Sequence, residues 1–132
     1  MYVTPFYAGL LALWYFALSM RVVQMRTHGS ASLGDGGDAS LLRRIRGHAN
    51  FAEYVPYILL MMALLELARF SHYFLHAVGI TLVVARLLHG YSLSYSTEFK
   101  FGRFYGTLLT FILVLVCGLG CIYVGIRGMS LL

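Results

Sequence analysis

The sequence contains few charged residues and very few acidic ones. Only 11% of its 132 residues are charged, and 60% are hydrophobic. A typical soluble domain carries about 25% charged residues. A soluble fold of this length could not bury so much apolar surface, so the composition excludes a water-soluble protein and predicts a membrane protein. The length allows a single domain, residues 1–132.

Cysteine is also scarce, and its placement excludes two kinds of site. Cys117 and Cys121 lie one helical turn apart, so a disulfide between them would connect no separate parts of the chain. The chain has no zinc-like spacing of Cys and His, and His28, His72 and His76 have no metal-ligand residues beside them. We therefore expect no metal and no disulfide framework.

Long apolar stretches are what the sequence does contain. A membrane-spanning helix needs ~20 mostly apolar residues. Four such stretches occur, at about residues 4–23, 47–69, 73–96 and 101–126. Segment 27–40 is rich in glycine and aspartate, as loops are, and Asp38 or Ser40 would cap the helix that follows. Because the other connections are short, we expect an all-α, antiparallel four-helix transmembrane bundle.

Lysine and arginine cluster at the ends of these stretches and set the expected orientation. Seven of the ten flank the first and third connections: Arg21, Arg26, Arg43, Arg44, Arg46, Lys100 and Arg103. Arg69 and Arg127 flank the opposite side. Since positive charge favours the cytoplasmic side, we place the first and third connections there and both termini outside. Membrane orientation explains the basic charge, so we expect no nucleic-acid partner.

A polar stripe interrupts the second apolar stretch. One face of the predicted helix carries Arg46, Asn50, Glu53 and Tyr57. A carboxylate at the depth of Glu53 is costly unless it is paired, which makes such a residue a functional candidate. On the third helix, Arg86 and His89 are three residues apart and share a face.

The stripe has two interpretations that the pattern alone leaves open. In the first, Glu53 and Arg86 form a structural ion pair and the other polar groups are hydrogen-bonded within the bundle. In the second, the excess of positive charge at this end binds an anion. That anion is either a lipid headgroup or a ligand that carries carboxylates.

A second pattern lies in the last apolar stretch, where small residues recur at spacings of four, four and three. The stripe consists of Cys117, Cys121, Gly125 and Gly128. Such stripes allow two helices to approach closely. The stripe predicts close packing of another helix, within the chain or between subunits.

Four motifs together resemble the MAPEG family, the membrane-associated proteins of eicosanoid and glutathione metabolism. They are GDGG at residues 34–37, RGHANFAEYVP at 46–56, VARLLH at 84–89 and RFYG at 103–106. The resemblance is greatest to the bacterial branch. It implies a homotrimer in the bacterial inner membrane, with glutathione bound at subunit interfaces that open toward the cytoplasm.

The resemblance also implies a set of site residues. Glutathione contacts are expected at Arg26, Arg46, Asn50, Glu53, Tyr54, Arg86 and His89. Arg103 corresponds to an arginine that stabilises the glutathione thiolate. Ala49, His89 and Leu93 depart from the residues of the specialised eicosanoid enzymes. The expected function is therefore a general glutathione transferase or peroxidase acting on a lipophilic electrophile or hydroperoxide.

Three alternatives accompany this expectation. The first is a non-catalytic lipid-binding or adaptor protein on the same scaffold, and the second is a simple bundle that binds anionic lipids. Retention of Arg46, Asn50 and Glu53 together favours the enzyme over both. The third is a transporter with Glu53 and His89 as a proton relay, and it lacks the internal repeats that transporters usually show.

Overall fold

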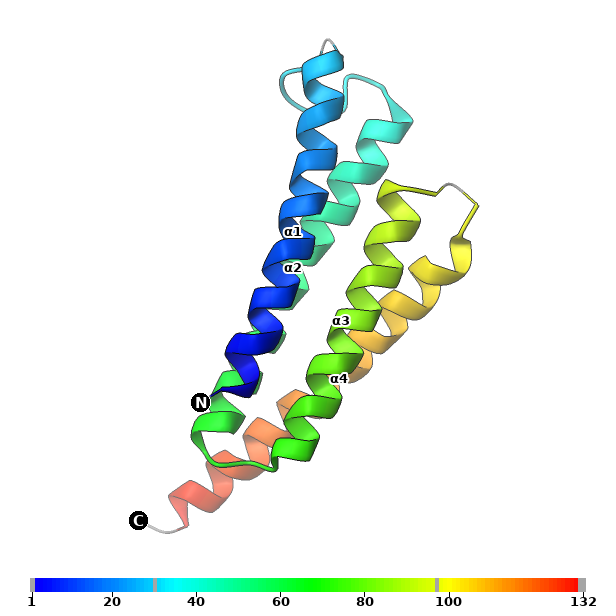
Figure 1. The fold of residues 1–132 in the computed structure, drawn as a ribbon. Coiled ribbons are helices and arrows are strands. Elements are labelled where there is room, and N and C mark those ends of the chain that lie inside the picture. The colour runs from blue at the N-terminus through cyan, green and yellow to red at the C-terminus, as the bar shows by residue number, and fades with distance from the viewer. Residues whose placement is uncertain (1, 30, 97, 131–132) are drawn as a thin grey trace.

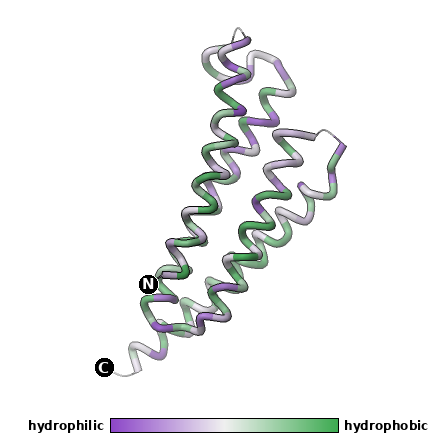
Figure 2. Tube along the Cα trace, in the orientation of Figure 1, coloured by the Kyte–Doolittle hydropathy of each residue, from purple (hydrophilic) through white to green (hydrophobic). Residues whose placement is uncertain are grey.

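The computed structural model describes residues 2–29, 31–96 and 98–130, which fold into four α-helices (Figure 1). The helices are α1 (Val3–His28), α2 (Ala39–Leu67), α3 (His72–Ser94) and α4 (Lys100–Met129). Each is long and apolar enough to cross a membrane. The predicted all-helical, four-span fold is therefore confirmed. Hydrophobic residues dominate along the helices, and hydrophilic ones gather toward the two ends of the bundle (Figure 2).

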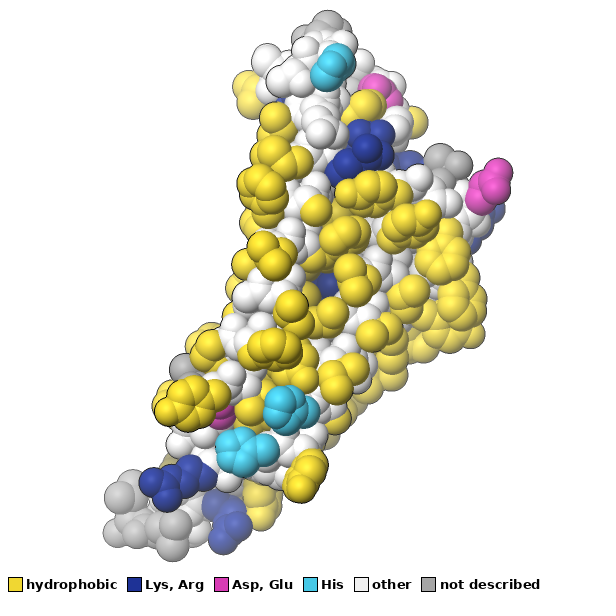
Figure 3. Space-filling model, viewed as in Figure 1, with side chains coloured by type: hydrophobic (Ala, Val, Ile, Leu, Met, Phe, Trp, Pro, Cys, Tyr) yellow, Lys and Arg dark blue, Asp and Glu magenta, His cyan; other side chains and the backbone are white. Residues whose placement is uncertain are grey.

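Consecutive helices run antiparallel, and they do not contribute equally to the core. Helices α2 and α3 pack against all other helices, whereas α1 and α4 do not contact each other. In the most apolar window of each span, 39% of the α2 residues and 44% of the α3 residues are buried. The corresponding share is 17% in both α1 and α4. The two outer helices therefore present most of their surface to lipid or to another protein chain, and hydrophobic side chains cover much of the molecule (Figure 3).

Glycines allow α3 to approach both outer helices closely. A methyl group at Gly79 of α3 would overlap the ring of Tyr7 from α1. A methyl group at Gly106 of α4 would lie 2.7 Å from the carbonyl oxygen of Ala85 in α3. Membrane helices associate through close packing more than through a hydrophobic driving force, so these glycines hold the bundle together.

Carboxylates cap the amino-terminal ends of α1 and α2. Asp38, one of the two predicted caps, accepts hydrogen bonds through Oδ1 from the backbone nitrogens of Ser40 (2.8 Å) and Leu41 (3.2 Å). The cap of α1 comes from a distant residue that the sequence did not reveal. Glu66 of α2, 8% exposed, accepts from the backbone nitrogens of Val3 and Thr4, each at 2.8 Å.

The small-residue stripe of α4 packs within the chain over only part of its length. Cys117 is fully buried, and the Cys121 sulfur lies 3.7 Å from the carbonyl oxygen of Met61. Gly125 and Gly128 are exposed and face open space within the chain. The first half of the stripe therefore packs against another helix of the same chain, and the second half does not.

Candidate functional site

A large cavity lies between α2, α3 and α4 at the end of the bundle that carries the α1–α2 loop. Its volume is about 790 Å³. It is lined by Arg43, Ser92, Leu93, Lys100, Arg103, Phe104, Thr107, Leu108 and Phe111. Cations therefore stand beside an apolar wall that α4 provides. This combination suits a molecule with an anionic part and a lipophilic part.

A smaller cavity of about 210 Å³ adjoins the first. It is lined by Leu42, Arg43, Arg46, Asn50, His89, Leu93 and Arg103. The two cavities share Arg43, Leu93 and Arg103, so we treat them together as the basic cleft. Four of the predicted site residues, Arg46, Asn50, His89 and Arg103, thus come together from three different helices.

The charge of the basic cleft is one-sided. Its cations are Arg43, Arg46, Lys100 and Arg103, and no carboxylate belongs to its lining. Charged groups within a membrane protein are costly unless they find a partner. Among the described residues, no three or more His, Cys, Asp and Glu side chains gather where they could hold a metal ion. The arrangement therefore favours an anionic organic ligand.

Arg86 lies behind the basic cleft and is only 1% exposed. Its Nη1 donates to Oδ1 of Asn50 at 2.9 Å, and its Nη2 donates to the carbonyl oxygen of Gly106 at 3.2 Å and to the hydroxyl of Thr110. In this chain Arg86 therefore orients Asn50, which lines the basic cleft, and does not line the cleft itself.

The alternative of an ion pair between Glu53 and Arg86 is wrong for this chain. The guanidinium group of Arg86 donates hydrogen bonds to three neutral oxygen atoms, one of them a backbone carbonyl oxygen. Glu53 is exposed on α2 and lines neither cavity of the basic cleft. The ring of its neighbour Tyr54 lies 5.6 Å from the ring of Phe111, which belongs to the apolar wall. Tyr54 thus supports the cleft from outside, and Glu53 is not part of its lining.

Arg26 also lies apart from the basic cleft. Its Nη1 donates to the carbonyl oxygen of Ser32 at 3.0 Å, so in this chain it holds the α1–α2 loop. Arg26 and Glu53 both remain outside the cleft of a single chain, and the other predicted residues line it or support it.

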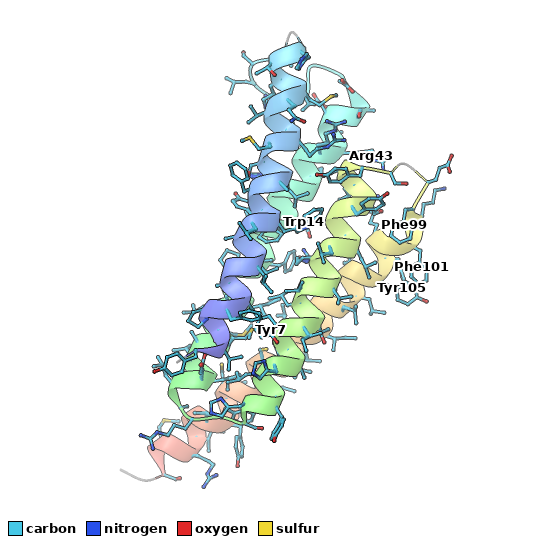
Figure 4. All side chains as sticks on the ribbon, viewed as in Figure 1. Tyr7, Trp14, Arg43, Phe99, Phe101 and Tyr105 are labelled. Atoms are coloured by element: carbon cyan, nitrogen blue, oxygen red, sulfur yellow. The ribbon has the colours of Figure 1, made fainter. Side chains whose placement is uncertain are left out.

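Arg43 lines the basic cleft and was absent from the predicted site. Its Nη2 donates to the carbonyl oxygens of Ser92 (2.8 Å) and Ser96 (2.9 Å), so it also holds the carboxyl end of α3 (Figure 4). Its position three residues before Arg46 is the sequence signal that could have identified it, because residues three apart share a helix face. No comparable signal marks Thr110, whose contact with Arg86 crosses between helices.

Comparison with known proteins identifies a family for this chain. Residues 4–123 match the MAPEG family. Inner membrane protein YecN of Escherichia coli strain K12 is 36% identical over 89 residues, which cover 67% of this chain and 68% of the relative. The same protein from strain CFT073 matches equally well. No solved structure matches the chain. The four spanning helices, the basic cleft and the match over nearly the whole chain show that this protein belongs to the MAPEG family.

Proposed function

We propose that the protein is a membrane-bound glutathione transferase, with glutathione peroxidase activity as a related reaction. The observation that carries the proposal is the basic cleft, which places four cations beside an apolar wall. Glutathione has two carboxylates, one ammonium group and a thiol. A tripeptide with this charge fits the cationic part, and a lipophilic electrophile fits the wall formed by Phe104, Leu108 and Phe111.

Four polar residues of the basic cleft have a role in this proposal. Arg46 and Arg43 bind the carboxylates of glutathione through charge-assisted hydrogen bonds, which are stronger than neutral ones. Asn50, oriented by Arg86, binds the peptide backbone. A free thiol has a pKa of about 8.5, and a nearby guanidinium lowers it. Arg103 supplies that guanidinium and stabilises the thiolate.

The reaction then proceeds at the thiolate sulfur. With an electrophilic carbon, a carbon–sulfur bond forms and the displaced electron pair leaves with the leaving group. With a hydroperoxide, the sulfur attacks the outer oxygen, the oxygen–oxygen bond breaks, and the alkoxide leaves and is protonated to the alcohol. A second glutathione then attacks the sulfur of the resulting glutathione sulfenic acid, which forms the disulfide and releases water. The protein contributes orientation and stabilisation of negative charge. No protein nucleophile takes part.

We further propose that the working unit is a homotrimer. Glu53 is exposed on a membrane-spanning helix, and among the described residues it has no hydrogen-bonding partner. A carboxylate in that position calls for a partner. In the trimer, Glu53 and a neighbouring chain's Arg26 lie at the interface, and Glu53 binds the glutathione ammonium group. The cation-rich end faces the cytoplasm of a bacterial inner membrane, by the positive-inside rule.

The test is to look for the ultraviolet absorbance of bound glutathione thiolate in purified protein near neutral pH. Arg103→Ala is expected to bind glutathione, to lose the thiolate signal and to lower turnover by about 100-fold. Arg127→Ala, at the opposite end of α4, is the matched control and should behave like the wild type. Lys100→Ala distinguishes Arg103 from the other α4 cation of the cleft.

Three results would change the proposal in different ways. Unchanged turnover in Arg103→Ala would remove the role of Arg103. Wild-type protein that binds glutathione without forming any thiolate would favour a non-catalytic lipid-binding or adaptor protein. Failure to bind glutathione would refute the enzyme proposal as a whole.

A further inference from the structure

A second basic pocket lies on the other side of α2, between α1, α2 and the end of α3. Its volume is about 80 Å³, against about 790 Å³ for the main cavity of the basic cleft. The arginine pocket, as we call it, is lined by Arg21, Ser40, Arg43, Arg44, Leu93, Ser94, Tyr95 and Ser96. Figure 3 shows Lys and Arg side chains gathered at this end of the bundle between α1 and α3.

Backbone carbonyls hold the three guanidinium groups in place. Arg21 Nη2 donates to the carbonyl oxygen of Ser94 at 2.9 Å, and its Cζ lies 4.4 Å from the ring centre of Tyr95. Arg44 Nη1 donates to the carbonyl oxygen of Arg21 at 3.2 Å. Arg43 Nη2 donates to the carbonyl oxygen of Ser92 in α3 and to that of Ser96, just after the end of α3. These contacts fix the positions of the guanidinium groups and leave each of them with further N–H donors.

One nearby carboxylate, that of Asp38, acts on Arg44, but it does not offset the three guanidinium groups of the arginine pocket. Its lining contains no carboxylate. The acidic residue at the start of α2, Asp38, caps that helix through Oδ1. Like charges this close repel one another unless an anion lies between them. The concentration of three guanidinium groups therefore calls for an anion that the chain itself does not supply.

Two buried polar atoms at the arginine pocket point to the same conclusion. Ser94 is 3% exposed, and its Oγ has no hydrogen-bond partner. The Nε of Arg21 is also buried without a partner. Buried polar groups are nearly always hydrogen-bonded, so each exception calls for an explanation. Both atoms belong to residues that line the pocket, and both can donate a hydrogen bond to an oxyanion bound there.

We propose that the arginine pocket binds a phosphate group. Guanidinium groups pair well with phosphate oxygens, and here they converge from two helices. The pocket is too small for a tripeptide, since its volume is about one tenth of the main cavity. It also lies at the end of the spanning helices, where phospholipid headgroups reside. The phosphate comes either from a phospholipid headgroup or from free phosphate in solution.

The phosphate joins three helices at one end of the bundle. Arg21 belongs to α1, Arg43 and Arg44 to α2, and Ser94 to α3. Arg43 and Leu93 also line the basic cleft, so the arginine pocket and the cleft share one cation, Arg43. The proposal does not depend on glutathione chemistry, and none of its tests uses glutathione.

The experiment compares wild-type protein with three variants after purification in mild detergent. Arg44→Gln removes a cation of the arginine pocket, Ser94→Ala removes only the unpartnered hydroxyl, and Arg127→Gln is the control at the opposite end. Native mass spectrometry measures retained phospholipid. Equilibrium dialysis of delipidated protein with labelled inorganic phosphate measures binding of the free ion. Helical circular dichroism and the elution volume of each variant show whether it is folded.

Wild type and Arg127→Gln are expected to retain one phospholipid per chain or to bind inorganic phosphate. Arg44→Gln should weaken that binding at least 10-fold, and Ser94→Ala should weaken it several-fold with the fold intact. Retained phospholipid without binding of the free ion identifies the headgroup as the source, and the reverse identifies free phosphate. Equal binding in all four proteins, or no binding of either probe to the wild type, would overturn the proposal.

Discussion

Glu66→Gln should destabilise the protein through a helix end far from the basic cleft. The Oε1 of Glu66 accepts from the backbone nitrogens of Tyr2 and Val3, and its Oε2 accepts from the backbone nitrogen of Thr4. A helix leaves its first backbone N–H groups unpaired. At the start of α1 these are the N–H groups of residues 2–4, since Pro5 has none, and all three depend on this one carboxylate. The carboxylate also places a negative charge at the positive end of the α1 dipole.

The magnitude follows from the atoms that glutamine can replace. The amide oxygen can take over the two bonds of Oε1, but the amide nitrogen cannot accept the bond from Thr4. One buried N–H group then loses its acceptor, which costs about 1–3 kcal/mol. Loss of the negative charge at the helix start costs about 0.3–1 kcal/mol more. We expect the free energy of unfolding to fall by roughly 1–4 kcal/mol, the total of these two effects.

The assay is reversible unfolding in mixed detergent micelles with increasing dodecyl sulfate, followed by circular dichroism. Glu98→Gln is the matched control, since Glu98 is exposed in the α3–α4 connection and should be nearly neutral. A Glu66→Gln variant no less stable than the control would refute the reasoning. In that case the carboxylate would not contribute to the attachment of α1 to α2.

Two further predictions use the same unfolding assay. Thr110→Val removes an acceptor of the buried Arg86 guanidinium and should cost about 1.5–3 kcal/mol, as hydrogen bonds to charged groups do. Thr107→Val is its control, and equal losses in the two variants would contradict the assigned contact. Gly79→Ala places a methyl group against the α1 tyrosine ring and should cost about 1–3 kcal/mol. Gly125→Ala meets open space, so a loss as large as that of Gly79→Ala would argue against overlap as the cause.

The sequence predicted the four spanning helices because the bilayer imposes a simple requirement. A stretch of ~20 apolar residues satisfies its backbone hydrogen bonds internally only as a helix, so hydropathy alone reveals it. Asp38 was also predictable, because a helix cap depends on neighbouring residues. Glu66 was not, because its three partners lie more than 60 residues away in sequence.

The candidate site was predictable only in part. The motif at residues 46–56 and the helical spacing identified Arg46 and Asn50, which line the basic cleft. The sequence suggested Glu53 as a partner of Arg86, because both are charged and lie in apolar stretches. The structure gives Arg86 neutral partners from α2 and α4. Which helix faces lie opposite one another depends on side-chain packing between helices, and a single sequence does not encode it in any local pattern.

The absence of contact between α1 and α4 has a consequence for how this protein can change over evolutionary time. Substitutions at sites that share no neighbours have additive effects on stability. Residues of α4 that form the apolar wall of the basic cleft can therefore vary without compensating changes in α1. A lineage could alter which lipophilic molecules it accepts one substitution at a time, while α1 keeps its attachments to α2 and α3.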